Sequence, residues 1–235
     1  MSAQVRIVLI DPSHPGNIGS VARAMKNMGL DDLVLVRPRA FPHEQAAALA
    51  AGAEDVLGAA RVVDTVPQAL VDCSFVAATT SRPRSLHWEF ATPRELAGRI
   101  VGLATSMRAA LLFGSERYGL ANEDLQYCNV LVRIPANPQY SSLNLAMAVQ
   151  LLAYEVFVAR EEPRTVVQLE APLATGEELE YFYTHLTQVL RDIRFEDRTG
   201  HLMDRLRRLF NRTQLDQNEL NILRGILSSI QEPRS

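Results

Sequence analysis

Short, nearly uninterrupted apolar runs recur along the first 160 residues of the chain, and segments with helical periodicity separate them. The runs are VRIVLI at 5–10, LVLV at 33–36, SFVAAT at 74–79, AALLFG at 109–114 and VLVRI at 130–134. A sheet with one wet face alternates apolar and polar residues, whereas parallel strands buried on both faces are continuously apolar. The pattern therefore predicts an α/β fold in which a mostly parallel sheet carries helices on both faces.

The character of the chain changes after residue 160. Residues 161–175 are mixed in character, charged and interrupted by proline, which predicts a linker. Three further helical patterns follow, at 177–193, 201–212 and 216–230. We therefore expect an α/β domain at 1–160, a linker at 161–175 and a small helical extension at 176–235.

Composition limits the classes of protein to consider. With 235 residues, 47% of them hydrophobic, the chain can bury one sizeable core and a small appendage. Cys73 and Cys128 form no ligand cluster, so we expect two buried thiols in a reducing cytosol. The five histidines lack metal-ligand spacing, and we expect no metal. No apolar run is long enough to span a bilayer, and no signal-peptide pattern opens the chain, so a cytoplasmic protein without membrane contact is expected.

Ligands of parallel α/β sheets bind at the carboxyl ends of the strands, so the loops that follow the apolar runs are the candidate site. In the first loop, DPSHPGNIGSVARAMKNMGL at 11–30, the glycines fit neither G-x-G-x-x-G nor G-K-[ST]. Asn17 could simply cap the following helix. Arg23 could be solvated, or it could bind a phosphate together with main-chain N–H groups.

The second loop, TTSRPRSLHW at 79–88, offers hydroxyls and two arginines: Thr79, Thr80, Ser81, Arg82 and Arg84. Taken alone, it reads as an ordinary polar loop. Trp88 is more typical of packing than of base stacking.

The third and fourth loops are richer in polar groups. In LLFGSERYGLAN at 111–122, Gly114 allows a close approach and Gly119 suits a turn, while Glu116 and Arg117 could pair with each other or with solvent. In RIPANPQYSSLNLAMAVQ at 133–150, Ser141 or Ser142 could cap the longest helix. Asn144, in the first turn of that apolar helix, needs a partner if it is buried.

Three motifs in these loops together resemble the SPOUT family of methyltransferases, in its branch that methylates the ribose 2′-oxygen of tRNA or rRNA. They are N-x-G-x-x-x-R at 17–23, G-x-E-x-x-G at 114–119 and the P…S-L-N segment that ends at residue 144. NPQYSSLNLAMAVQ and the helical tail are most similar to bacterial members that act on the first nucleotide of the tRNA anticodon loop. A tRNA partner is thus implied, and no DNA partner is expected.

The resemblance implies properties that periodicity alone does not give. They are a trefoil knot at the carboxyl end of the α/β domain, S-adenosylmethionine as the cofactor, and a homodimer whose sites are each completed by the partner chain. The cofactor residues that it implies are Thr79, Thr80, Ser81, Gly114, Ile134, Ser141, Ser142 and Leu143.

Arg23 is the residue that the resemblance places at the 2′-hydroxyl. Because a guanidinium stays protonated in proteins, we expect Arg23 to bind the neighbouring phosphate and stabilise the developing oxyanion rather than act as the base. Asn17 and Ser142 are expected to orient the nucleotide.

The extension contains a basic segment at 198–212, with five arginines and one aspartate. A solvated helix face would explain it, but in a chain of net charge −3 we favour a surface for RNA phosphates. The candidates are Arg205, Arg207, Arg208 and Arg212 from the extension, together with Arg82 and Arg84. The aromatic residues at 181–183 could equally be core or stacking platforms.

Other classes of protein fit the motifs less well. A nucleotide-dependent oxidoreductase should carry an acidic residue after its second strand, where this chain has Arg37 and Pro38. A methyltransferase for another tRNA or rRNA site, and a non-catalytic RNA-binding protein, remain as alternatives.

Overall fold

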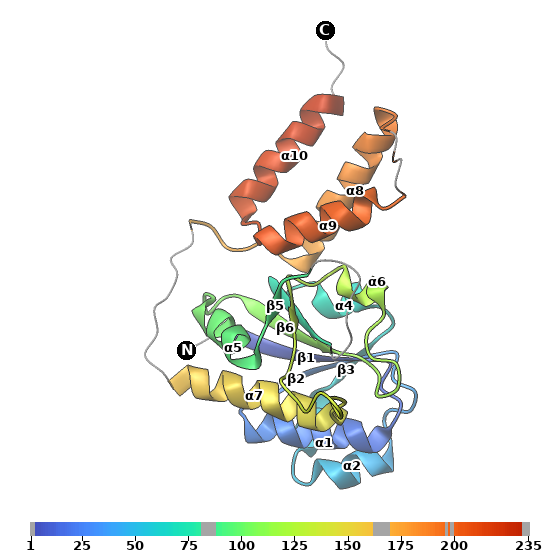
Figure 1. Cartoon of the computed structure of the whole chain (residues 1–235), viewed down its shortest axis with the longest axis vertical. Coiled ribbons are helices and arrows are strands. Elements are labelled where there is room, and N and C mark those ends of the chain that lie inside the picture. Colours follow the sequence, from blue (N-terminus) through green and yellow to red (C-terminus); the bar gives the residue numbers. More distant parts are fainter. Residues whose placement is uncertain (1–2, 81–87, 162–169, 196, 198–199, 232–235) are drawn as a thin grey trace.

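The structure is a computed structural model that describes residues 3–80, 88–161, 170–195, 197 and 200–231 (Figure 1). Its strands are β1 Gln4–Ile10, β2 Asp32–Val36, β3 Arg61–Val63, β4 Phe75–Thr79, β5 Phe90–Ala91, β6 Arg108–Phe113 and β7 Val130–Val132. Its helices are α1 Pro15–Asn27, α2 Glu44–Ala50, α3 Glu54–Ala59, α4 Val66–Leu70, α5 Pro93–Gly102, α6 Asn122–Leu125, α7 Leu145–Glu161, α8 Gly176–Asp192, α9 Leu202–Thr213 and α10 Gln217–Gln231.

The seven strands form one sheet in the order β3-β2-β1-β6-β4-β7-β5, and every neighbouring pair is parallel. Val8 of β1, for example, lies opposite Val34 of β2 on one side and Leu112 of β6 on the other. The parallel sheet predicted from the continuous apolar runs is confirmed.

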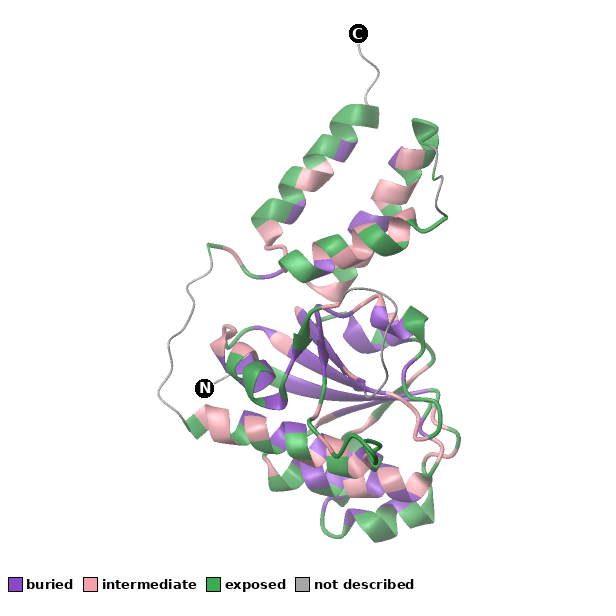
Figure 2. Ribbon diagram, in the orientation of Figure 1, coloured by how far each residue is buried: buried purple, intermediate pink, exposed green. Residues whose placement is uncertain are grey.

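Helices cover both faces of the sheet, as expected. Along β1, Val5, Ile7 and Leu9 enter one core, whereas Val8 and Ile10 enter the other. The first core lies under α1, α5 and α7, with α2 packed outside α1; α4 and α6 lie on the other face (Figures 1 and 2). The five inner strands β1, β2, β4, β6 and β7 are buried almost throughout (Figure 2).

Two strands and two helices were not predicted. β3 and β5 are the outermost strands and have only three and two residues. Both expose apolar side chains, with Val62 53% and Phe90 38% exposed. α3 and α4 have six and five residues, too few for a helical period to stand out.

Two helix starts differ from the expected ones. α1 begins at Pro15, so Asn17 lies inside its first turn and the interpretation of Asn17 as the cap is wrong. α7 begins at Leu145, because the Asn144 side chain accepts a hydrogen bond from the Ala146 N–H at 2.9 Å. Neither Ser141 nor Ser142 is the cap.

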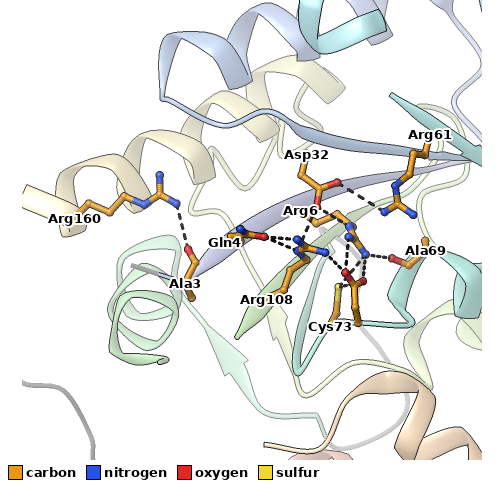
Figure 3. A network of polar contacts seen from close by, with 10 residues as sticks. Ala3, Gln4, Arg6, Asp32, Arg61, Ala69, Cys73, Arg108 and Arg160 are labelled. Atoms are coloured by element: carbon orange, nitrogen blue, oxygen red, sulfur yellow. Dashed lines mark hydrogen bonds and ion pairs between the residues drawn. The ribbon is translucent and has the colours of Figure 1, made fainter. Parts of the chain in front are cut away.

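A network of ion pairs lies at the amino ends of the strands, opposite the candidate loops (Figure 3). Arg6 is only 3% exposed and pairs with Asp32 at 2.9 Å and Asp72 at 2.5 Å. It also donates to the Ala69 carbonyl at 2.8 Å. A buried guanidinium needs such partners, and through them Arg6 connects β1 to Asp32 at the start of β2, to the Ala69 carbonyl of α4 and to Asp72.

The C-terminal helices have a core of their own, which includes Phe182, Tyr183, Leu220 and Leu227. They also contact the α/β part directly. The Gly176 N–H donates to the Cys73 carbonyl at 2.8 Å, and the buried Asn129 amide donates to the Asn211 carbonyl at 2.7 Å. The extension is therefore hydrogen-bonded to segments just before β4 and β7, beyond its covalent connection.

Both cysteines are free and buried, as predicted. Burial raises the pKa of the Cys73 thiol to about 11, so it stays protonated at neutral pH. Among the described helices, none has the length and apolar character to cross a membrane.

Candidate active site

A cavity of about 320 Å³ lies at the carboxyl ends of β4, β6 and β7. Every predicted cofactor residue that the structure describes lines it: Thr79, Thr80, Gly114, Ile134, Ser141, Ser142 and Leu143. Ser81, Arg82 and Arg84 lie outside the described residues. Three loops that are far apart in the sequence thus meet around one hollow, because parallel strands end at the same edge.

The walls of the cavity combine apolar and polar groups. Phe113, Leu120, Val132 and Leu145 contribute buried apolar side chains. Backbone amides and the hydroxyls of serine and threonine contribute donors and acceptors. The volume is at the small end of the range for small-molecule pockets, about 300–1,000 Å³.

Glu116 connects the third loop to the first. Its carboxylate accepts hydrogen bonds from the Ser13 N–H at 2.9 Å, the Ser13 hydroxyl at 2.7 Å and the Asn17 amide at 2.8 Å. A longer bond comes from the His14 N–H at 3.3 Å. The interpretation in which Glu116 pairs with Arg117 or with solvent is therefore wrong.

These hydrogen bonds change the acidity of Glu116. Burial raises its pKa, but the bonds from Asn17 and from the hydroxyl and N–H of Ser13 outweigh burial and lower the pKa to about 2. Glu116 is thus a carboxylate at neutral pH, with its acceptor sites engaged inside the protein. This arrangement suits a structural anion rather than a general base.

Asn17 continues the same network to the fourth loop. Its NH₂ group faces Glu116, so its oxygen faces Asn144, whose amide donates to it at 3.1 Å. The Asn144 oxygen then accepts from the Ala146 N–H. The carboxylate at one end and the N–H at the other fix the orientation of both amides. Asn144 is exposed but has these two partners.

Gly114 is needed where the third loop turns back on itself. A Cβ at Gly114 would lie 2.1 Å from the carbonyl carbon of Gly119, which is impossible without moving the backbone. Gly119 has φ +66°, as expected for a turn glycine. Both glycines therefore shape the loop that carries Glu116.

Arg23 lies apart from this cavity. It is exposed on α1 and is absent from the residues that line the hollow in its own chain. It makes no polar contact within the described part of the chain. Its guanidinium is thus available to a phosphate.

The four candidate arginines of the extension do not share one surface. Arg205, Arg208 and Arg212 lie three and four residues apart on α9 and so share a helix face. The Arg208 guanidinium lies 6.0 Å from the Trp88 ring centre, beside the end of the second loop. Arg207 turns inward, paired with Glu180 at 3.0 Å and stacked 4.3 Å from the Tyr183 ring centre.

The aromatic residues at the start of α8 also divide. Phe182 and Tyr183 are each 1% exposed and belong to the core of the extension, whereas Tyr181 is 62% exposed. Among the described residues, no group of three or more histidine, cysteine or acidic side chains is placed to hold a metal ion.

Comparison with known proteins agrees with this geometry. A model described as the SpoU rRNA methylase family matches residues 4–154, and one described as the C-terminal domain of the tRNA methyltransferase TrmJ matches residues 177–235. This chain belongs to the SpoU methylase family. The family predicted from the three motifs is thereby confirmed.

Individual relatives of this SpoU methylase match it over nearly its whole length. The tRNA (cytidine/uridine-2′-O-)-methyltransferase TrmJ of Escherichia coli K12 is 51% identical over 99% of this chain and 97% of its own. The crystal structure of TrmJ from Z. mobilis ZM4 is similar with a TM-score of 0.87 and 38% identity, over 98% of this chain and 100% of that one. A probable methylase from Haemophilus influenzae, 44% identical, matches with a TM-score of 0.64 over 98% of this chain and 97% of that one.

Sequence reasoning identified the lining of the cavity in this SpoU methylase but missed the network beneath it. Glu116 lay within a quoted motif, yet its partners are about 100 residues earlier in the chain. For Asn144, the last residue of the third motif, the sequence predicts only that a buried amide needs a partner. The one available signal was that both residues, and Asn17, stand in the three motifs.

Proposed function

We propose that this protein transfers a methyl group from S-adenosylmethionine to a ribose 2′-oxygen of tRNA, on the cytidine or uridine that begins the anticodon loop. The observation that carries the proposal is one cavity lined by the second, third and fourth loops, to which Glu116 and Asn144 connect the first motif by hydrogen bonds at Asn17. Family membership and relatives named as tRNA methyltransferases support it.

The cavity suits S-adenosylmethionine in its chemistry. Ile134, Leu143 and Leu145 offer an apolar bed for an adenine, and Ser141, Ser142 and the threonines offer polar partners for the ribose and amino acid parts. When bound, this cofactor supplies an electrophilic methyl group on a sulfonium. The loops contribute mainly by fixing its orientation toward the acceptor oxygen, which is the larger part of such catalysis.

Arg23 acts on the RNA side of the site in this proposal. It binds the phosphate next to the target ribose with its two-pronged guanidinium and stabilises the negative charge that develops on the 2′-oxygen. Ser142, exposed at the cavity, orients the nucleotide. Asn17 acts as a positioning residue, because both ends of its amide are engaged by Glu116 and Asn144.

The proposal includes a homodimer with a site shared between chains. On α7, Met147, Leu151 and Tyr154 form an apolar stripe and are 62%, 42% and 50% exposed. An apolar stripe of this kind is typical of a protein interface. Since Arg23 is outside the cavity lining of its own chain, pairing through α7 would let two chains complete each site. We also propose the trefoil knot and a cytoplasmic location.

The arginine face of α9 is the proposed tRNA contact of the extension. Arg205, Arg208 and Arg212 share it, and the Arg208 guanidinium lies 6.0 Å from the Trp88 ring centre. Arg82 and Arg84, which lie outside the described residues, are proposed to add to the same contact. We propose residues 1–160 as the methyltransferase domain, 161–175 as the linker and 176–235 as the tRNA-binding extension.

The experiment is methylation in vitro with methyl-labelled S-adenosylmethionine. The purified protein is incubated with tRNA and, separately, with rRNA, and 2′-O-methyl groups are mapped to single nucleotides. We expect one methyl group, on the first anticodon-loop nucleotide. A methyl group elsewhere would move the substrate site, and a protein that does not bind the cofactor would overturn the methyltransferase assignment.

A further inference from the structure

A groove of about 830 Å³ runs between α8 and α10 in the extension, away from the cavity described above. Its walls include Tyr181, His185 and Arg191 from α8, and Asn221, Arg224 and Gly225 from α10. The spacing of these residues along each helix places them on the two facing sides. We call it the α8–α10 groove.

The charge of the groove is positive, although the chain as a whole is acidic. Among the described residues, three arginines line it and no aspartate or glutamate does. Arg207 forms part of the floor and is paired with Glu180. Arg191 and Arg224 have no carboxylate partner within the described part of the chain. Two guanidinium groups are therefore available to an anion.

Two described carboxylates on α8, those of Glu180 and Asp192, already have partners. Asp192 accepts hydrogen bonds from Gln188 at 2.7 Å and from Gln231 at 2.9 Å. Glu180 is taken up by Arg207. Neither acid therefore competes directly for Arg191 and Arg224.

Tyr181 supplies a flat surface at the same place. Its ring is 62% exposed, and the Arg224 guanidinium lies 4.8 Å from the ring centre. An arginine–aromatic pair of this kind can take an unpaired base by stacking while the guanidinium binds a phosphate. Phe182 and Tyr183, the neighbours in sequence, are buried and cannot do this.

Gly225 is unexplained by packing. It stands in the interior of α10, where glycine costs a helix about 1 kcal/mol relative to alanine. A Cβ there would meet no atom within 4 Å, so no neighbour requires the glycine. Its effect is to leave the wall of the α8–α10 groove low.

We propose that the α8–α10 groove binds an unpaired segment of the tRNA substrate, with Tyr181 stacking on a base and Arg191 and Arg224 contacting phosphates. The inference rests on the proposed function for the identity of the RNA. It adds a second contact surface to the arginine face of α9.

Substitutions in the full-length protein test the groove. Arg224→Gln removes one phosphate contact, and Gly225→Glu fills the groove with bulk and negative charge while favouring the helix. Gly98→Glu is the matched control, because Gly98 is also an exposed helical glycine with open space at its Cβ. Tyr181→Leu and Tyr181→Phe separate stacking from general packing.

The readouts are the Kd for a tRNA transcript at several salt concentrations and, separately, the Kd for S-adenosylmethionine. We expect Gly225→Glu and Tyr181→Leu to weaken tRNA binding about tenfold. Arg224→Gln should weaken tRNA binding about threefold. It should also reduce the slope of log K against the logarithm of the salt concentration by about 0.7–0.9, the amount expected for one lost phosphate contact. Gly98→Glu and Tyr181→Phe should stay within about twofold, and cofactor binding should not change.

If Gly225→Glu and Arg224→Gln bound tRNA with wild-type affinity, the proposed role of the groove in tRNA binding would be overturned, whether or not the protein methylates tRNA. Parallel loss of cofactor binding would also overturn it, since that would indicate a damaged fold. Failure of methyl transfer by the wild-type protein would instead contradict the proposed function. Because tRNA binding is measured without turnover, the two failures are distinguishable.

Discussion

Glu116 is the single residue that joins most of the candidate site. Its carboxylate takes hydrogen bonds from the first loop at Ser13 and Asn17, and Asn17 passes the connection to Asn144 in the fourth loop. Glu116 also lines the cavity, so its hydrogen bonds hold the first loop against one wall of that cavity. In our account Glu116 fixes geometry, and it takes no proton from the substrate.

Glu116→Gln tests this role. The amide oxygen of glutamine can still accept hydrogen bonds, but its NH₂ group would face the donors of Ser13 and Asn17. We therefore expect the free energy of unfolding to fall by about 1–3 kcal/mol. Urea denaturation at pH 7 measures it, with Glu123→Gln, at an exposed position of α6, as the control. Cofactor affinity should fall with Glu116→Gln. A variant as stable as wild type would contradict the network.

The difference in stability between wild type and Glu116→Gln should depend on pH in a definite direction. The folded pKa of Glu116 is about 2, below the ordinary value of 4.5, so its contribution is present above pH 4.5 and is lost as the pH falls toward 2. The stability difference between wild type and Glu116→Gln should therefore shrink below pH 4.5. Denaturation series between pH 7 and 3 would show it, and a constant difference would contradict the low pKa.

At the scale of elements, helix α1 lies unusually close to α2. A Cβ on Gly19 would lie 2.1 Å from the Ala46 carbonyl oxygen, backbone that cannot simply move aside. The glycine of the first motif thus serves helix packing. No phosphate-binding loop is needed to explain it, which agrees with the poor fit of its spacing to nucleotide fingerprints.

Gly19→Ala should destabilise the protein by about 2 kcal/mol or more, because α1 and α2 must separate. Gly98→Ala, the matched change in α5 where a Cβ meets nothing, should stabilise it by about 0.5–1 kcal/mol. Thermal unfolding of both variants measures the difference. If Gly19→Ala were also neutral or stabilising, the close approach of α1 and α2 would be refuted.

The central strands and the long helices could be predicted because burial on both faces leaves a continuous apolar signal. β3 and β5 could not be predicted, because an edge strand of two or three residues carries no such signal. The start of α7 could not be predicted, because Ser141, Ser142 and Asn144 are all suitable helix-capping residues. The structure shows that the Asn144 side chain accepts the hydrogen bond from the first turn. At the site, loop positions followed from the motifs, whereas the Glu116 bonds join residues about 100 positions apart.

At the scale of the whole molecule, the proposed homodimer would build each complete site from two chains. The Met147, Leu151 and Tyr154 stripe on α7 is exposed in one chain, and Arg23 stands outside the cavity of that chain. A dimer through α7 would cover this apolar stripe and bring Arg23 of one chain to the cavity of the other. The extension, bonded to the α/β part at Gly176 and Asn129, would then carry tRNA contacts at a fixed place.

Leu151→Asp places a charge in the proposed interface and should convert the dimer to a monomer with little methyl transfer. Sedimentation equilibrium measures the mass, and Val62→Asp on the edge strand β3, 53% exposed, is the control. The control should remain a dimer. A Leu151→Asp dimer with normal activity would place the interface elsewhere.

We propose that the cofactor and the RNA are bound by different parts of one site, with Arg23 on the RNA side. Calorimetric titration of Arg23→Ala with S-adenosylmethionine, alongside methyl transfer to tRNA, tests it most directly. We predict cofactor affinity within about twofold of wild type and a rate lowered at least about a hundredfold, as for other lost transition-state contacts. Arg23→Lys, which keeps the charge but loses the fork, should also be slow. Loss of cofactor binding in Arg23→Ala, or methyl transfer at the normal rate, would contradict the account.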